Sequence, residues 1–134
     1  MERSAGILLP IFSLPGRYGA GTLGAEAREF VDFLRDAGQR WWQILPIGPT
    51  GAGNSPYTSE STFAGNPLLI DLEPLAAEGL LDPGDLKSAE IPPSARIDYG
   101  ALYRTREPLL RKAFQRARGN GDEAARAFAE KNPW

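Results

Sequence analysis

The chain has 134 residues, of which 42% are hydrophobic and 24% charged, the balance of a globular protein long enough for one domain with its own core. It contains no cysteine and no histidine, which excludes disulfides, thiolate nucleophiles, histidine catalysis and most zinc sites within these residues. The net charge of −2 gives no general attraction for nucleic acid, and no apolar run approaches the roughly eighteen residues of a membrane span or the core of a secretory signal, so we expect a cytoplasmic protein that binds neither nucleic acid nor membrane.

The first third of the chain has the pattern of a strand, a helix and a second strand. Residues 5–9 and 41–45 are short apolar runs, each followed at once by a proline. Between them, residues 25–37 place apolar side chains at the spacing of one helix face and charged side chains on the other. This order favours a parallel βαβ unit, because parallel strands need a crossover connection that is usually a helix.

A long loop follows the second strand, from residue 46 to about residue 67. It is rich in Gly, Pro, Ser and Thr, and it carries two aromatic residues, Tyr57 and Phe63. Loops of this length inside a compact domain are usually either functional or disordered. The two aromatic side chains favour a functional loop.

The second half of the chain predicts mainly helix. After an apolar run at 68–72, Pro74 should open a short helix, and residues 82–97, which are rich in proline, should be mostly irregular. A longer helix should begin at Tyr99 and be kinked at Pro108. The residues Gly-Asn-Gly at 119–121 should break it, and Asp122, next in the chain, should cap a last helix.

Residues 19–24 form a GxGxxG pattern between the first strand and the helix, which is the setting of a dinucleotide-binding turn. The first glycine comes several residues after the strand ends at Pro10, which is late for a tight turn. The second strand is followed by Leu45 and Pro46, and no acidic residue that could hold a ribose comes before Glu60. A nucleotide-binding domain therefore stays as a minor alternative.

Two pairs of residues could belong to a glycoside site. Asp71 and Glu73 could point the same way from a strand, but they are better explained as caps of the following turn than as a catalytic pair. Trp41 and Trp42 should face opposite sides of their strand, and packing explains them better than stacking on sugar rings. We expect no catalytic residue, no metal site and no cofactor site in this chain.

The loop around Tyr57 fits a sugar site better. Pro56 stiffens the backbone before the aromatic ring, and Asn54, Ser55 and Thr58 surround it with short polar side chains. A pyranose ring offers an apolar face to an aromatic side chain and hydroxyls to polar groups. A loop tyrosine that only packs against its neighbours explains the same pattern equally well.

Several motifs in a fixed order resemble the start of glycoside hydrolase family 77, and together they extend over nearly the whole chain. They lie at residues 5–9, 13–16, 41–51, 55–57, 63–72, 98–100 and 132–134. No single motif is unique to the family, but the ordered set is specific.

The resemblance implies an α/β fold, the N-terminal part of a (β/α)₈ barrel of several hundred residues. Residues 1–72 would supply the first two strands, the helix between them and the substrate-binding loop, and residues 73–134 a mainly helical insertion, truncated at its C-terminus. The activity implied is transfer of α-1,4-glucan segments from a donor to glucose or another glucan, by a retaining mechanism with an Asp nucleophile and a Glu acid and base. Those carboxylates follow later strands, so this chain alone should be inactive.

The family resemblance assigns two substrate-binding residues to this chain. The tyrosine of Ser-Pro-Tyr, here Tyr57, would line the donor-sugar pocket, and the serine, here Ser55, would contact the glucan. The family often has Tyr at the position of Ala52, where it belongs to a secondary glucan groove, and often Asp and Gln at the positions of Asn54 and Thr58. These differences affect the secondary groove and the choice of acceptor more than the donor pocket. A non-catalytic carbohydrate-binding module that uses the same loop is the main alternative.

Overall fold

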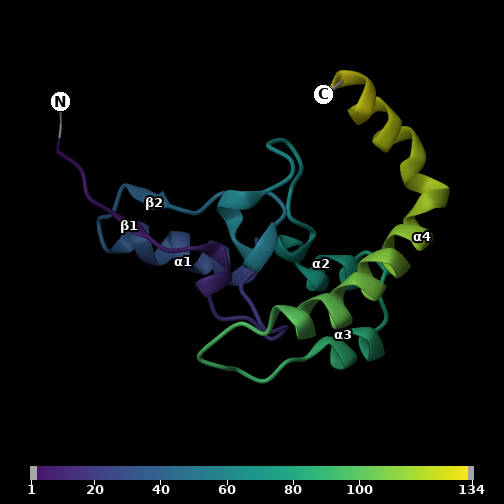
Figure 1. The fold of residues 1–134 in the computed structure, drawn as a ribbon, viewed down its shortest axis with the longest axis horizontal. Helices are drawn as coiled ribbons and strands as arrows, with labels where there is room; N and C mark the ends of the chain where they lie inside the picture. Colours follow the sequence, from purple (N-terminus) through teal and green to yellow (C-terminus); the bar gives the residue numbers. More distant parts are fainter. Residues whose placement is uncertain (1–2, 133–134) are drawn as a thin grey trace.

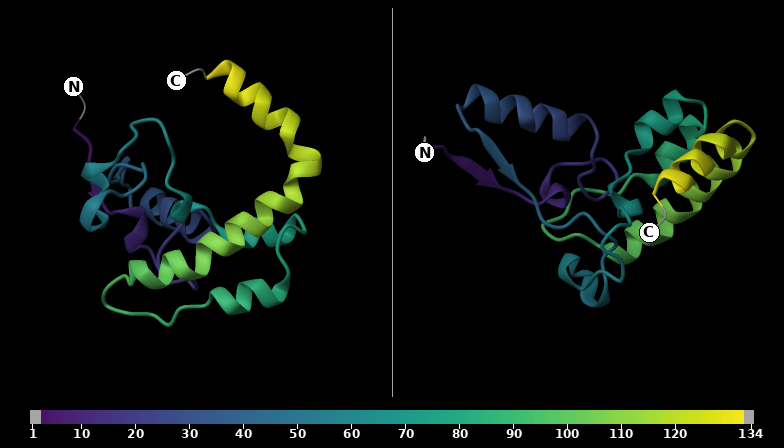
Figure 2. Two further views of the ribbon diagram at one scale, coloured as in Figure 1. Left: turned by 45° about the vertical axis from the view of Figure 1, so that its right-hand side comes forward. Right: turned by 90° about the horizontal axis from the view of Figure 1, so that it is seen from above.

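The computed structural model describes residues 3–132, and within this range the side chains of residues 119–122 and 124 are not described. Its elements follow the order of two short strands with a helix between them, then a long loop with 3₁₀ turns, then three helices (Figure 1). The first strands and helix lie at one end of the molecule, and the three later helices at the other (Figure 2). The motif predicted at 132–134 is described only at Asn132.

The predicted parallel βαβ unit is confirmed. Strand β1 (Gly6–Leu8) pairs in parallel with β2 (Trp41–Gln43), and α1 (Ala25–Asp36) connects them. Both strands are shorter than the apolar runs that predict them. Gly6 lets the two strands approach closely, because a Cβ atom there would lie 2.4 Å from the carbonyl oxygen of Trp41.

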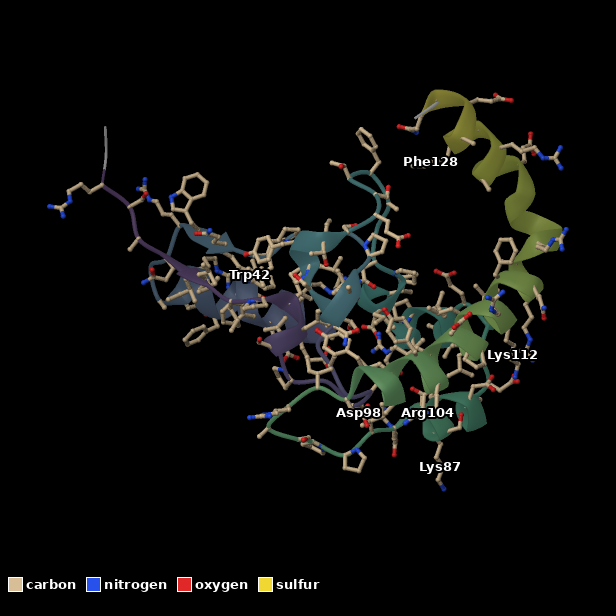
Figure 3. The ribbon with its side chains drawn as sticks, viewed as in Figure 1. Trp42, Lys87, Asp98, Arg104, Lys112 and Phe128 are labelled. Atoms are coloured by element: carbon tan, nitrogen blue, oxygen red, sulfur yellow. The ribbon has the colours of Figure 1, made fainter. Side chains whose placement is uncertain are left out.

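Helix α1 packs on the strands through part of the apolar face that its sequence predicts. Ala27 and Leu34 are buried, and the edge of the Phe30 ring meets Trp42 with 5.0 Å between ring centroids (Trp42 is labelled in Figure 3). Val31 and Ala37, predicted on the same face, are exposed. Within residues 3–132 the sheet consists of two strands, so it can cover only part of the apolar face of the helix.

Two short helices follow the loop, and capping side chains determine where each of them begins. Helix α2 (Leu72–Ala77) begins after Asp71, whose side chain accepts a hydrogen bond from the Glu73 N–H at 3.1 Å. The predicted start at Pro74 is wrong by two residues: Pro74 lies in the first turn, where a missing N–H costs nothing. Asp71 acts as a cap, as the sequence indicates.

Helix α3 (Pro83–Ala89) corrects the expectation of irregular structure at 82–97. Pro83 occupies the first helical position, and the Asp85 carboxylate accepts a hydrogen bond from the backbone N–H of Asp82 at 2.7 Å. The sequence Asp-Pro-Gly-Asp therefore opens a helix in the manner of a capping box. The proline content of the segment obscures this local signal.

Helix α4 (Tyr99–Lys131) is continuous, so the predicted break at 119–121 and the predicted cap at Asp122 are wrong. Asp98 caps its start by accepting from the Ala101 N–H at 2.9 Å, and Pro108 lies inside it. A glycine in a helix costs only about 0.5–1 kcal/mol relative to alanine, and the flanking Ala-, Arg- and Glu-rich sequence favours helix. The helix is curved, and its C-terminal end stands away from the rest (Figures 1 and 2). The kink expected at Pro108 stays a prediction.

The three later helices pack together around a core that includes Leu72, Leu109 and Ala113. Ion pairs hold α3 to α4 at the surface: Lys112 Nζ lies 2.7 Å from Asp85 Oδ2, and Arg116 Nη2 lies 2.8 Å from a carboxylate oxygen of Asp82 (Lys112 is labelled in Figure 3). The boundary predicted between residues 72 and 73 stays a prediction. Among residues 3–132, no helix combines the length and the apolar character needed to cross a membrane.

Candidate functional site at the end of the second strand

The long loop leaves the C-terminal end of β2 and is closed at its base. The backbone N–H of Asn66 donates to the carbonyl oxygen of Ile47 at 2.8 Å, so the two ends of the loop lie side by side. The Asn66 side chain is buried and accepts a hydrogen bond from the Leu68 N–H at 2.9 Å, which begins the 3₁₀ turn η4 (Pro67–Leu69). An Asn before a proline is a common turn signal, so the sequence itself indicates this turn.

The tip of the loop is tied together by its own backbone. The Gly51 N–H donates to the Ser55 carbonyl at 3.1 Å, and the Asn54 N–H donates to the Gly51 carbonyl at 3.0 Å. Gly53 and Asn54 both have positive φ, at 69° and 58°, a conformation that these two residue types adopt more readily than others. The glycine-rich sequence of the tip therefore makes a compact turn rather than an open loop.

The two predicted substrate-binding residues lie next to each other on this tip. Ser55 caps the 3₁₀ turn η3 (Pro56–Thr58), and its Oγ accepts a hydrogen bond from the Tyr57 N–H at 3.3 Å. The side chain of Thr58 donates to the Ser55 carbonyl at 3.3 Å. Tyr57 is 73% exposed, so within this chain its ring has an open face rather than a packed one. Ala52 is also exposed, on the preceding turn.

A small cavity of about 190 Å³ lies beside the loop, next to the residues that follow both strands. Residues after β1 (Pro10 to Ser13), after β2 (Leu45 to Ile47), from the loop (Thr50 and Pro56) and from the start of α4 (Tyr99) contribute to its wall. Burial raises the pKa of the Tyr99 hydroxyl above its ordinary value. The loops that follow two neighbouring parallel strands thus meet around one hollow.

The acidic residues near α2 have structural partners. Tyr18 is buried, and its hydroxyl donates to Glu73 Oε1 at 2.5 Å, while Arg17 Nη1 donates to the same oxygen at 3.0 Å. Burial, and next the hydrogen bond to Glu73, raise the pKa of Tyr18. With Asp71 capping α2, both carboxylates have structural contacts within this chain, and the expectation that neither is catalytic stays a prediction.

The last glycine of the GxGxxG segment lies next to the Asp71 carboxylate, where a bound phosphate would have to be. Gly24 precedes the first residue of α1, and a Cβ atom on Gly24 would lie 1.6 Å from Asp71 Oδ2. A helix N-terminus attracts anions, and here it faces the chain's own carboxylate. This arrangement counts against the dinucleotide interpretation.

The two tryptophans have different surroundings. Trp42 packs against α1, and its Nε1 donates to the Leu9 carbonyl at 2.8 Å. Trp41 is 65% exposed on the other face of the strand, where its Nε1 donates to Ser4 Oγ at 2.8 Å. Packing therefore explains Trp42, whereas Trp41 has little cover within this chain.

Over residues 3–132, no three Asp, Glu, His or Cys side chains gather closely enough to hold a metal ion.

Comparison with known proteins places these features in one family. The family model described as 4-alpha-glucanotransferase, of the glycoside hydrolase 77 family, matches residues 9–134. The 4-alpha-glucanotransferase of Thermus thermophilus is 50% identical over all of this chain, which spans 27% of that protein. The 4-alpha-glucanotransferase of Streptococcus pneumoniae is 48% identical over 90% of this chain and 24% of its own length.

A solved structure agrees with the sequence comparisons. The amylomaltase of Streptococcus agalactiae, determined in complex with acarbose, superposes with a TM-score of 0.90 at 39% identity. The superposition includes 99% of this chain and 28% of that structure. The chain therefore spans about a quarter of the length of the relatives that it matches.

Proposed function

The chain belongs to the glycoside hydrolase 77 family of 4-alpha-glucanotransferases, and from this premise we propose that the complete protein moves segments of α-1,4-glucan from a donor chain to an acceptor. The acceptor is glucose or another glucan, and the substrates are maltooligosaccharides and amylose. The observation that carries the proposal in this chain is the closed loop at the end of β2, which exposes the ring of Tyr57 next to Ser55 and contributes Pro56, the residue between them, to the wall of a cavity.

In this proposal β1, α1 and β2 are the first strand, helix and second strand of a (β/α)₈ barrel. Parallel pairing of the strands and the position of the loop at their C-terminal ends support it, because barrel active sites form from the loops at that end. The exposed Trp41 and Leu8 also support it, since the remaining strands and their side chains would cover them. Residues 1–72 then begin the barrel, and residues 73–134 belong to a mainly helical insertion.

The reaction that we propose is a retaining double displacement. One carboxylate attacks the anomeric carbon of the donor sugar while a carboxylic acid protonates the leaving oxygen. The acceptor hydroxyl then attacks the same carbon, gives its proton to the second carboxylate, now a base, and frees the first carboxylate. Asp71 and Glu73 are engaged in a cap and an ion pair, so we place the catalytic carboxylates outside this chain. The parts contributed here are the ring of Tyr57 beside the donor sugar and the hydroxyl of Ser55 toward the glucan. We propose no cofactor.

The experiment that tests the proposal is incubation of the complete protein with maltotriose. Transfer yields glucose together with maltooligosaccharides longer than the substrate, which chromatography separates. Acarbose, which is bound in the amylomaltase of Streptococcus agalactiae, should compete with maltotriose. Retention on amylose without formation of any product would favour a carbohydrate-binding module. Retention on a nucleotide matrix without any product would favour a nucleotide-binding domain. Either result would overturn the transferase proposal. A cytoplasmic location stays a prediction.

A further inference from the structure

Arg106 is a cation in the interior of the molecule. It lies on α4, its residue is 0% exposed, and it is the largest fully buried side chain among the described residues. Its Nη1 donates to the carbonyl oxygen of Leu68 at 2.5 Å and to that of Ile70 at 3.2 Å. Its Nε and Nη2 atoms have no hydrogen-bond partner within residues 3–132.

Stability alone does not explain a buried charge at this place. Burial lowers the pKa of Arg106, which shows that the site disfavours the charged form, and the charge of Asp71 only partly offsets this. An apolar side chain of similar volume would avoid the cost of removing a cation from water. The guanidinium does what an apolar side chain cannot: it donates hydrogen bonds to two carbonyl oxygens of one turn and so fixes that turn relative to α4.

The turn that Arg106 holds is the base of the loop described above. Leu68 lies in η4, and its N–H is capped by Asn66, whose own N–H donates to Ile47 at the other end of the loop. Arg106 is thus connected through one turn and two hydrogen bonds to both ends of the segment that carries Ser55 and Tyr57.

The same face of α4 meets the loop at a second point. A hydrogen bond of 3.3 Å joins the Tyr103 hydroxyl to Thr50 Oγ1, and Tyr103 precedes Arg106 by three residues, so both lie on one face of the helix. Next to them, the buried side chain of Leu102 packs in one cluster with Leu68. Helix α4 therefore contacts the loop near its tip and at its base.

We infer that Arg106 is a positioning residue, which fixes the loop of residues 46–67 so that Tyr57 meets the donor sugar in a reactive geometry. The inference rests on the proposed transferase function. A small displacement of a group that lines a reacting sugar costs rate, since the enzyme must then reorganise during the reaction. Arg106 touches no substrate itself, so its effect must pass through the loop.

The test uses the complete protein and steady-state kinetics with maltotriose. R106M should lower kcat by about threefold or more while KM changes less, and R106K, whose ammonium can still donate to a carbonyl, should recover most of the loss. In the Y57A background, R106M should have little further effect on kcat, because the group that it positions is absent. If R106M does not fold, R106Q, which keeps a donor amide but not the charge, replaces it throughout.

L109A is the matched control. Leu109 is also buried on α4, but it packs in a cluster that contains no residue of the loop 46–67. It should lower the melting temperature at least as much as R106M and leave kcat unchanged. Equal kcat losses in L109A and R106M, or additive losses in R106M and Y57A, would reduce Arg106 to a stabilising residue. An unmodified protein without transfer activity would overturn the proposed function and this inference together, whereas an active protein that keeps its kcat in R106M overturns the inference alone.

Discussion

Tyr57 exposes its aromatic ring to solvent, although the backbone that carries the ring is held in place. An exposed aromatic ring contributes little to folding, yet Pro56 and the Ser55 cap restrict the backbone that carries it. A restricted ring loses little freedom when it meets a ligand, which is the condition for efficient recognition. This is why we assign the ring to the substrate rather than to packing within the chain.

Replacement of Tyr57 by alanine should act on the transition state. The transferred sugar carries positive charge at its anomeric carbon as the bond breaks, and an electron-rich ring beside it favours that charge by roughly 1–2 kcal/mol when water is excluded. In the complete protein, Tyr57→Ala should therefore lower kcat about tenfold or more with a smaller change in KM, and Tyr57→Phe should be milder.

The control for this variant is Phe114→Ala, which removes another exposed aromatic ring, on α4 and outside the loop. Phe114→Ala should leave kcat unchanged. A folded Tyr57→Ala protein with the kcat of the unmodified protein would remove Tyr57 from the site.

At the scale of the elements, helix ends determine how the segments join. Asp71 caps α2, and its Oδ2 atom also lies close to Gly24, the residue before α1, so one carboxylate lies beside the starts of two helices. A negatively charged side chain suits this position better than a neutral one, because each helix N-terminus carries a partial positive charge.

Gly24→Ala should destabilise the protein by about 1–2 kcal/mol, because the added methyl group must displace the Asp71 carboxylate and so removes the α2 cap. Chemical denaturation measures the loss. The control is Gly84→Ala in the first turn of α3, where an added Cβ atom meets nothing within 4 Å, and it should be nearly neutral or stabilising. In the Asp71→Ala background the cost of Gly24→Ala should shrink, and a cost unchanged by Asp71→Ala would contradict a clash between the added methyl group and the Asp71 carboxylate.

The contact between α3 and α4 should weaken in acid. Hydrogen bonds from Arg116 and Lys112 hold the pKa of Asp82 at about 2, and a hydrogen bond from Lys112 lowers that of Asp85. Groups with depressed pKa values stabilise the fold above their unfolded pKa of about 4, and this contribution disappears as the pH falls through the folded value. The loss therefore belongs to the interval from about pH 4 to about pH 2.

Lys112→Met should lower the melting temperature at neutral pH, and the difference from the unmodified protein should close toward about pH 2. All these side chains reach solvent, so added salt should narrow the same difference. Arg111→Met is the control, because Arg111 forms an ion pair with Glu107 on its own helix, and its effect should be smaller. A difference that stayed constant down to pH 2 would show that Lys112 acts by packing.

At the scale of the whole molecule, the chain leaves much apolar surface without cover. Ile7, Leu8 and Trp41 on the strands and Val31 and Phe33 on α1 are all exposed. Two strands also present two unpaired edges, which readily pair with other chains. In the barrel that we propose, other strands and helices would cover these surfaces and edges.

The isolated chain should therefore self-associate or unfold without a sharp transition, and it should not release glucose from maltotriose. Size-exclusion chromatography with light scattering and a thermal melt by circular dichroism measure the first two properties. Trp41→Ser combined with Leu8→Thr should reduce the association by removing apolar surface from the strands. A monodisperse monomer with a sharp cooperative melt would show that these surfaces need no further cover.

The sequence by itself determined the local features and the family. The strand–helix–strand order, the loop after the second strand and the cap at Asp71 follow from short-range patterns, and the ordered motifs identify glycoside hydrolase 77. The glycines at 119–121 indicate a break, but α4 continues through them, because the cost of a glycine is small beside the helix preference of the long flanks. The capping box of α3 is present in the sequence, but the prolines around it favour irregular structure.

Only the tertiary structure decided where the charges and faces go. Helical spacing puts Arg106 on the apolar face of α4, between Leu102 and Leu109, but only the fold shows what it binds there, because the carbonyls of Leu68 and Ile70 approach it from 36 to 38 positions away. The exposure of Val31 on a helix with a clear apolar face likewise depends on the width of the sheet beneath. Side-chain periodicity is a property of one segment, whereas burial and hydrogen-bond partners depend on which distant segments pack against it.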